Sequence, residues 1–279
     1  MSSPASPLLA VEGLTRRFQG LVAVDGVDVA VREGTVHGLI GPNGAGKTTC
    51  FNMISGVLAP SEGRVSLDGH PLDGLPPYRR TARGLARTFQ NIRIFSEMTV
   101  LENVMTGMHA RLTAGLGILW RSPAFRAEER AAKARARDLL GFVGLLAAAD
   151  HRAGDLPYGD QRRLEIARAL ACEPRLVLLD EPAAGMNPAE THALLGLLRR
   201  LRDERGLTLL LVEHDMPLVM SLCDRLTVLN FGKRIADGTP AEVRRDPAVI
   251  AAYLGAQQAE AQSGAHPAEA GGHSAEAAR

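Results

Sequence analysis

Residues 41–48 read G-P-N-G-A-G-K-T. This stretch fits the pattern G-x-x-x-x-G-K-[ST], in which glycines let the backbone approach a phosphate closely and successive N–H groups form a concave anion site. An apolar run at 35–40 precedes it, and the pattern of 47–56 predicts a helix whose positive end faces the same anion. A strand, a glycine-rich loop and a helix in this order predict a polyphosphate site on an α/β fold.

The residue types within this loop fit the phosphates of a nucleotide together with Mg²⁺. Lys47, one of three lysines in the chain, is expected to reach the β- and γ-phosphates, and the hydroxyl of Thr48 is expected to bind the metal ion. The loop residues expected to contact the nucleotide are Gly41, Asn43, Gly44, Ala45, Gly46, Lys47, Thr48 and Thr49.

A second apolar run, at 176–179, ends in two acids, Asp180 and Glu181. A buried strand of a parallel sheet delivers such acids to its carboxyl edge, where open α/β sheets bind ligands. There Asp180 suits Mg²⁺, and Glu181 is placed to orient or deprotonate a water molecule. An apolar strand that ends in Asp-Glu is weak evidence alone and more often a surface pair. Beside the phosphate loop it indicates a metal and water site.

The rest of the chain alternates between strand and helix, except in one long segment. Strands are expected at 207–212 and 225–229 with helices between them, which indicates a largely parallel sheet covered by helices. Residues 21–31 alternate as in a half-buried antiparallel strand. From about 100 to 168 no strand pattern occurs, so a helical insert is expected there. The tail from 256 has no apolar periodicity and is expected to be disordered.

Composition excludes several other classes of protein. The chain has 279 residues, a net charge of +1, 46% apolar residues and 23% charged residues, which is ordinary for a globular protein without a strong field toward nucleic acid. Three separated cysteines argue against a disulfide framework or a zinc site. Acids interleave with the arginines of 121–137, which indicates a solvated helix face. No signal peptide or membrane-spanning run is expected, so any membrane role would depend on partners.

Three further motifs complete the pattern: R-T-F-Q-N at 87–91, L-P-Y-G-D-Q-R-R-L-E-I-A-R-A-L at 156–170, and V-E-H-D at 212–215. With the phosphate loop and the acids, they resemble the ATPase subunits of ABC transporters. The resemblance implies ATP and Mg²⁺ as cofactors and a P-loop NTPase (RecA-like) core. That core has a mainly parallel sheet, an N-terminal antiparallel β part and an inserted helical subdomain. The implied ranges are 8–92 and 166–255 for the core, 93–165 for the helical subdomain, and 256–279 for the tail.

The resemblance also implies roles for single residues outside the loop. Phe18 would stack on adenine, although a core position is the alternative. Gln90 would sense the γ-phosphate, contribute to the metal site and act with Glu181 in catalysis, where a lone glutamine is otherwise a surface residue. His214 would donate a hydrogen bond to the γ-phosphate, where a lone histidine is more often a satisfied core or surface residue.

The segment from 156 resembles the family signature, which caps the γ-phosphate held by a second subunit with N–H groups and a helix N-terminus. Its expected contacts are Tyr158, Gly159 and Asp160. The general form of this signature is L-S-G-G-Q, so Pro157 replaces the serine, Tyr158 replaces the first glycine and Asp160 replaces the glutamine. The lost hydroxyl and the added charge call into question the full activity of the site that this loop completes.

Residues 183–188, A-A-G-M-N-P, and the E-H-D-M at 213–216 further resemble the ATPase subunits of branched-chain amino acid importers. The implied partners are a second ATPase subunit in a hetero- or homodimer, membrane permeases and, indirectly, a solute-binding protein, on the cytoplasmic side of the inner membrane. The alternatives are an ABC transporter for another solute (an amide, urea or an exported lipid) and a non-transport ABC ATPase. A GTPase switch is disfavoured, because no Asn precedes any lysine as N-K-x-D requires.

Overall fold

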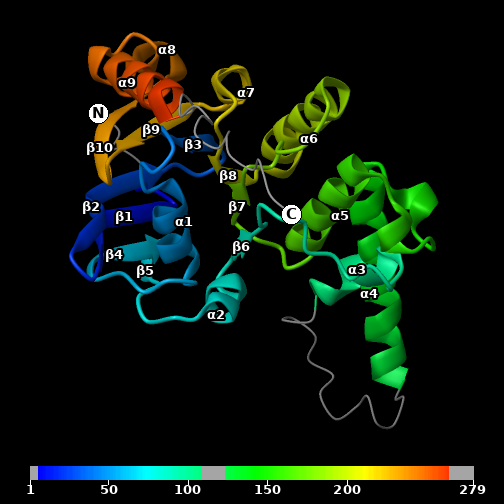
Figure 1. Cartoon of the computed structure of the whole chain (residues 1–279). Coiled ribbons are helices and arrows are strands. Elements are labelled where there is room, and N and C mark those ends of the chain that lie inside the picture. The colour runs from blue at the N-terminus through cyan, green and yellow to red at the C-terminus, as the bar shows by residue number, and fades with distance from the viewer. Residues whose placement is uncertain (1–5, 109–122, 264–279) are drawn as a thin grey trace, which may run out of the picture.

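The computed structural model describes residues 6–108 and 123–263 (Figure 1). Within these ranges the chain forms two sheets. The first is antiparallel and has the strand order β2-β1-β4-β5. Its strands are β1 (Leu9–Phe18), β2 (Leu21–Val31), β4 (Glu62–Leu67) and β5 (His70–Pro71). The antiparallel strand expected at 21–31 is therefore confirmed, and it pairs with a strand that the apolar pattern had not indicated.

The second sheet has the order β10-β9-β3-β8-β7-β6 and is parallel except between β9 and β10. Its strands are β3 (Val36–Ile40), β6 (Leu85–Arg87), β7 (Leu176–Asp180), β8 (Thr208–Val212), β9 (Arg225–Asn230) and β10 (Lys233–Gly238). Every residue of β3, β7 and β8 is buried, which explains their continuous apolar runs. The carboxyl ends of β6, β7 and β8 meet at one edge of this sheet, as expected for β7 and β8, whereas the apolar pattern had not indicated β6.

Helix α1 (Lys47–Ser55) lies between the two sheets and contacts strands of both. Phe51, Met53 and Ile54 are fully buried in one apolar cluster with Leu14 of β1 and Leu39 of β3. The helix ends at Gly56, whose φ of 80° is in the left-handed region that favours glycine. This packing fixes the phosphate loop, because the loop leads directly into the first turn of the helix.

The other face of the parallel sheet carries a second apolar cluster. Leu178 and Leu210 face the α1 side, whereas their neighbours Leu179 and Leu211 face the helices on the opposite side. This alternation follows from the two-residue period of a strand. The helices outside the insert are α2 (Pro77–Ala82), α6 (Pro188–Arg205), α7 (Met216–Leu222), α8 (Pro240–Val243) and α9 (Pro247–Ser263). No helix in the described ranges is long and apolar enough to cross a membrane.

The expected helical insert is present in its described parts. It contains α3 (Val100–Thr106), α4 (Pro123–Val143) and α5 (Tyr158–Leu170), and the short 3-10 turns Leu146–Ala148 and Ala153–Asp155 lie between α4 and α5. Figure 1 shows these helices grouped beyond β6, on the side away from the antiparallel sheet. Helix α5 runs across the predicted boundary between residues 165 and 166 and contacts β6. The insert is therefore tied to the core by a continuous helix.

The C-terminal tail begins later than the sequence indicated. Disorder was expected from residue 256, but α9 continues to Ser263. Residues 256–263 are mainly alanine, glutamine and glutamate, which favour helix even without an apolar face. The remainder of the expected tail, 264–279, lies outside the described residues.

Candidate nucleotide site

The phosphate loop has a backbone that only glycine permits at two positions. Gly41 has a φ of 151°, and a Cβ there would lie 2.1 Å from the carbonyl oxygen of Leu229. Gly46 has a φ of 98°, and a Cβ there would lie 2.5 Å from the carbonyl oxygen of Ala23. Both contacts are far below van der Waals distance and involve rigid backbone. The glycines in the motif therefore serve close packing around the loop as well as its curvature.

A hairpin from the C-terminal half of the chain braces this loop. The N–H of Gly232 donates to the carbonyl oxygen of Ala45 at 3.0 Å, and the carbonyl oxygen of Gly232 accepts from the N–H of Asp25 at 2.8 Å. Gly232 lies in the turn between β9 and β10, and Asp25 lies on β2. The loop is thus held between the N-terminal sheet and the last strands of the parallel sheet.

A cavity of about 440 Å³ opens over the loop. Its lining residues are Leu21, Val22, Ala23, Asn43, Gly44, Ala45, Gly46, Lys47, Thr48, Thr49, Glu181, Phe231 and Gly232. Seven of the eight loop residues predicted to contact nucleotide are among them. The eighth, Gly41, accepts a hydrogen bond from Nζ of Lys47 at 2.7 Å. Burial lowers the pKa of Lys47, and the nearby Glu181 carboxylate opposes that shift.

Three predicted catalytic side chains meet at the edge of this cavity. Nε2 of Gln90 donates to Oε2 of Glu181 at 2.8 Å, and Nδ1 of His214 lies 3.9 Å from Oε1 of the same carboxylate. They follow β6, β7 and β8, whose carboxyl ends lie side by side. Glu181 has a φ of 44°, a left-handed conformation that is uncommon for a non-glycine residue. The structure therefore places Glu181 between a donor and an imidazole, facing the phosphate loop.

Two of the predicted metal ligands, Thr48 on α1 and Asp180 at the end of β7, differ in exposure. Thr48 is exposed in the cavity, whereas Asp180 is buried and does not line it. Nη2 of Arg87 donates to Oδ2 of Asp180 at 2.8 Å. The sequence did not single out Arg87. In the sequence, the feature that could have indicated Arg87 was its position three residues before Gln90. Its strand pairs with β7, which only the structure reveals.

A buried glutamate behind the catalytic group was also missed. Glu213 is 1% exposed, and its carboxylate accepts from the N–H of Ala183 at 3.0 Å and from the N–H of His214 at 3.2 Å. Burial raises the pKa of Glu213, while these backbone donors oppose the shift. The side chain fixes the turn after Glu181 relative to His214. Its signal in the sequence was an acid placed directly after an apolar strand.

A buried ion pair connects α5 to the loop that carries Gln90. Arg162 is fully buried and donates to the carbonyl oxygens of Phe89 and Gln90, each at 2.8 Å, and to Oε2 of Glu165 at 2.8 Å. Burial raises the pKa of Glu165, and the Arg162 charge opposes that shift. The pair was visible only as R-x-x-E in a helix, a spacing that is common on helix surfaces. It ties α5, the helix that begins with the signature residues, to the backbone of the loop that carries Gln90.

The signature residues form the first turn of α5. Oη of Tyr158 donates to the carbonyl oxygen of Ala184 at 3.1 Å, and Asp160 pairs with Arg163. The negative charge that Asp160 adds to the signature is therefore balanced within the same helix. Gly159 lies against Glu190, where a Cβ would be 3.0 Å from the Oε1 atom. None of these residues is among the described residues that line the cavity of their own chain.

The aromatic residue expected to hold the base lies beside the cavity. Phe18 is the last residue of β1 and is 40% exposed. The guanidinium of Arg16 lies over its ring, 4.6 Å from the ring centre. It does not line the cavity, although Leu21 and Val22, which begin the next strand, do. Its stacking role remains a prediction. Phe231, which the sequence did not single out, is 85% exposed and does line the cavity.

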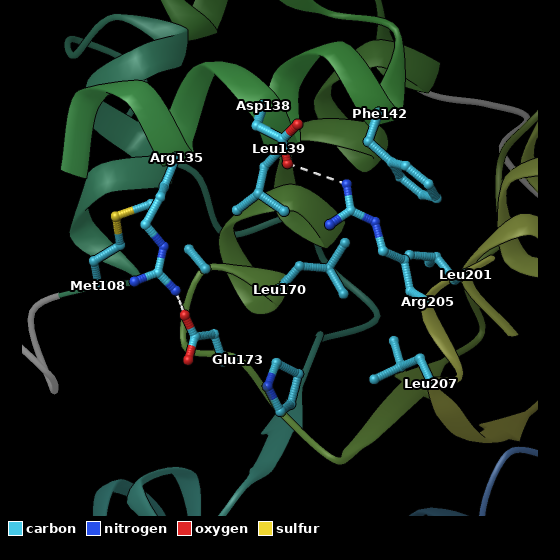
Figure 2. A pocket seen from close by; sticks show the side chains of 12 residues that line it. Met108, Arg135, Asp138, Leu139, Phe142, Leu170, Glu173, Leu201, Arg205 and Leu207 are labelled. Atoms are coloured by element: carbon cyan, nitrogen blue, oxygen red, sulfur yellow. Dashed lines mark hydrogen bonds and ion pairs between the residues drawn. The ribbon is translucent and has the colours of Figure 1, made fainter. Parts of the chain in front are cut away.

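A second cavity, of about 290 Å³, lies where α4 meets the core. Figure 2 shows Asp138 and Arg135 of α4 directed toward Arg205 and Glu173 respectively, above apolar side chains such as Leu170. Nη2 of Arg205 lies 3.1 Å from Oδ2 of Asp138, and Arg135 forms an ion pair with Glu173. This cavity contains none of the predicted site residues. It marks the contact between the helical insert and the end of α6.

Two family models match the sequence. One, described as ABC transporter, covers residues 24–184. The other, described as branched-chain amino acid ATP-binding cassette transporter, covers residues 233–259. The first spans the phosphate loop, the signature segment and both acids, so it includes most of the geometry described above.

Individual relatives match nearly the whole chain. It is 50% identical over 250 residues to the high-affinity branched-chain amino acid transport ATP-binding protein BraF of Pseudomonas aeruginosa, covering 89% of this chain and 98% of that protein. It is 47% identical over 253 residues to LivG of Escherichia coli K12, of the same description, covering 90% and 99%. A solved ATP-binding cassette of an ABC transporter in its ADP conformation matches with a TM-score of 0.77 at 34% identity, covering 89% and 98%. These matches confirm the predicted P-loop NTPase fold and the predicted ATP hydrolysis, and the chain belongs to the ABC transporter family.

Proposed function

We propose that this chain is the ATP-hydrolysing subunit that powers an importer of branched-chain amino acids. The observation that carries the proposal is the 50% identity to BraF over 89% of the chain. The match of the C-terminal family model to residues 233–259 supports the same solute class. Residues 233–259 hold β10, α8 and most of α9 and contain none of the predicted catalytic residues, so this support does not rest on those residues.

The site residues suggest how hydrolysis proceeds. The loop N–H groups and Lys47 bind the β- and γ-phosphates. Glu181 accepts a proton from the attacking water, and Gln90, 2.8 Å from its carboxylate, keeps that carboxylate turned toward the phosphate loop. His214, on the other side of Glu181, donates to the γ-phosphate oxygen as charge develops there.

We also propose that the site takes Mg²⁺ with the nucleotide. The residues fit, because the exposed hydroxyl of Thr48 and the carboxylate of Glu181 line one cavity and Asp180 directly precedes Glu181. Thr48 and Asp180 would hold the ion, with Gln90 beside it. Oxygen ligands of this kind suit a hard divalent cation. When bound, the ion would neutralise charge on the phosphates.

A second ATPase subunit would complete each nucleotide site. The first turn of α5 exposes Tyr158, Gly159 and Asp160 away from the cavity of its own chain, and helix N-termini favour bound phosphate. We propose that these residues contact the γ-phosphate held by the partner subunit. Because Arg163 balances Asp160, the added charge is compatible with that role.

Permeases would hold the chain at the cytoplasmic face of the inner membrane. A groove of about 750 Å³ lies between α2, α3 and α5, with Arg93, Phe95 and Arg168 in its lining. Its lining includes Arg87 and Arg93, which lie three residues before and three residues after Gln90. Glu165 of α5 lines the groove and accepts a hydrogen bond from the N–H of Phe89. A permease segment in this groove would therefore contact the loop that carries Gln90.

Co-purification from membranes tests this function. A tagged chain is expected to isolate with permease subunits and a second ATPase subunit, and the complex in vesicles is expected to accumulate labelled leucine, isoleucine or valine when ATP is supplied. Uptake of a labelled amide or urea in place of these amino acids would contradict the proposed solute. A chain that hydrolyses ATP but isolates without membrane proteins would contradict the transport role itself.

A further inference from the structure

Arg87 holds the side chain of Asp180 at the edge of the parallel sheet. Nη2 of Arg87 lies 2.8 Å from Oδ2 of Asp180, and each side chain is only 8% exposed. Arg87 ends β6, Asp180 ends β7, and the two strands are parallel neighbours. The contact therefore joins the strand before the Gln90 loop to the acid that precedes Glu181.

The same guanidinium also holds the helix of the phosphate loop. Nη1 of Arg87 donates to Oδ1 of Asn52 at 2.7 Å and to Oγ of Ser55 at 2.6 Å, both on α1. The ring centres of Phe51 and Phe89 lie 5.5 and 5.1 Å from the guanidinium carbon. Arginine stays protonated at any pH that the fold survives. A permanent positive charge is thus fixed between α1 and the end of β7.

We propose that Arg87 is a positioning residue that shares the Asp180 carboxylate with the divalent cation and thereby lowers the affinity of the site for that cation. The inference rests on the proposed metal role of Asp180. Arg87 occupies Oδ2, and Oδ1 accepts no hydrogen bond from residues 6–108 or 123–263. One oxygen remains for the ion, and a fixed positive charge on the same carboxylate opposes the approach of a second cation. A moderate affinity lets the ion leave with the product nucleotide.

The test measures metal affinity directly, separately from turnover. The full-length chain is titrated with Mn²⁺ in the presence of a non-hydrolysable ATP analogue, and free Mn²⁺ is followed by electron paramagnetic resonance. Arg87→Met and Arg87→Gln remove the charge and are each expected to bind Mn²⁺ about tenfold more tightly. Arg87→Lys keeps the charge and is expected to stay within about threefold of wild type. If Arg87→Met proves unstable, the Mn²⁺ titration of Arg87→Gln decides the test.

Arg80 offers a matched control. It is 2% exposed and also binds α1, through the carbonyl oxygens of Met53 and Ile54 at 2.9 and 2.7 Å, but it does not contact Asp180. Arg80→Met therefore removes a buried arginine of α2 that contacts the same helix α1, without changing the contacts of Asp180. It is expected to lower the unfolding temperature while the Mn²⁺ affinity stays at the wild-type value.

The outcomes separate this inference from the function on which it depends. Asp180→Asn is expected to weaken Mn²⁺ binding, and an unchanged affinity would refute the metal role of Asp180. If Asp180→Asn weakens binding but the neutral Arg87 variants leave it unchanged or weaker, the metal role stands and the role of Arg87 is wrong. A tightening in Arg80→Met equal to that in Arg87→Met would also overturn it, because the effect would then not depend on contact with Asp180.

Discussion

The phosphate loop and the first turn of α5 are the two regions that we propose to bind phosphate through backbone N–H groups, but they are supported in different ways. The loop is braced on two sides by its own chain, and Glu181 faces it across one cavity. The turn of α5 lines no part of that cavity, and its firm support lies one turn deeper, in the Arg162–Glu165 pair. In our proposal, the phosphate loop belongs to the site of hydrolysis. The first turn of α5 presents a surface whose position is coupled to the Gln90 backbone.

The largest effect is expected from Glu181→Gln in the cavity. The amide cannot take a proton from water, so hydrolysis is expected to fall by about 10²–10⁴-fold while ATP binding persists. Phosphate release and a nucleotide titration measure the two quantities. Glu204→Gln, an exposed acid paired with Arg200 on α6, is the control. Turnover near the wild-type value in Glu181→Gln would refute its role as the base.

Breaking the support of α5 comes next. Arg162→Met leaves Glu165 buried without its partner and is expected to lower the free energy of unfolding by about 3–5 kcal/mol, measured by urea denaturation. Replacing both residues in Arg162→Met/Glu165→Leu is expected to restore most of that stability. Hydrolysis should be low in the single variant and remain low in the double variant, because the carbonyl oxygens of Phe89 and Gln90 lack the Arg162 donor in both. Recovery of both quantities would show that α5 and the catalytic loop are not coupled through Arg162.

The strand beneath the phosphate loop predicts a pH dependence. Burial lowers the pKa of His37 from 6.5 to about 4, and its Nε2 lies 2.9 Å from Oγ1 of Thr227. The unfolded chain therefore takes up this proton at a higher pH than the folded chain. The contribution of His37 to the free energy of unfolding is complete above pH 6.5. It is lost as the pH falls toward 4, by up to about 3 kcal/mol. The stability difference between wild type and His37→Gln, followed against pH, should show this slope, and a constant difference would contradict it.

Removal of the loop lysine tests the cavity through binding. Lys47→Ala loses a point charge directed at the β- and γ-phosphates, so the affinity for ATP is expected to fall at least about tenfold in calorimetry. Lys133→Ala, an exposed lysine on α4 paired with Glu129, is the matched control and should bind normally. Equal affinities in the two variants would count against the phosphate site as described.

The smallest effect is expected at the surface of α5. Tyr158→Phe removes the hydrogen bond from Oη to the carbonyl oxygen of Ala184, which lies 3.1 Å away in a half-exposed position. The loss of stability is expected to be about 0.5–1.5 kcal/mol, seen as a small shift in thermal unfolding. A loss as large as that in Arg162→Met would show that the first turn, rather than the buried pair, anchors the helix.

The sequence predicted the parts of the site that depend on local pattern. The loop at 41–48 and the pair Asp180 and Glu181 each follow an apolar strand, so motif and context are contiguous. A parallel sheet then brings Gln90, Glu181 and His214 together, because their strands end at the same edge. The alternation of strand and helix was enough to predict β3, β7, β8 and β9 of the parallel sheet, but it did not indicate β6 or β10.

The missed residues depend on which distant segments become neighbours. Arg87 meets Asp180 only because β6 pairs with β7, and the two residues are 93 positions apart. Arg162 reaches the Gln90 backbone across 72 positions, although its sequence signal was an ordinary helix pair. The extended C-terminal helix was missed for another reason, since residues 256–263 rely on helix propensity without the apolar stripe that predicts helices.

The brace at Gly232 has a practical consequence for how this protein is engineered. The last of the sequence motifs ends at Met216, so a fragment that stopped after β9 would keep every one of them. It would nevertheless lose the N–H that holds Ala45 and the carbonyl that holds Asp25. Truncations, fusions and purification tags should therefore be placed beyond α9. The smallest fragment able to bind a nucleotide is longer than the segment that contains the motifs.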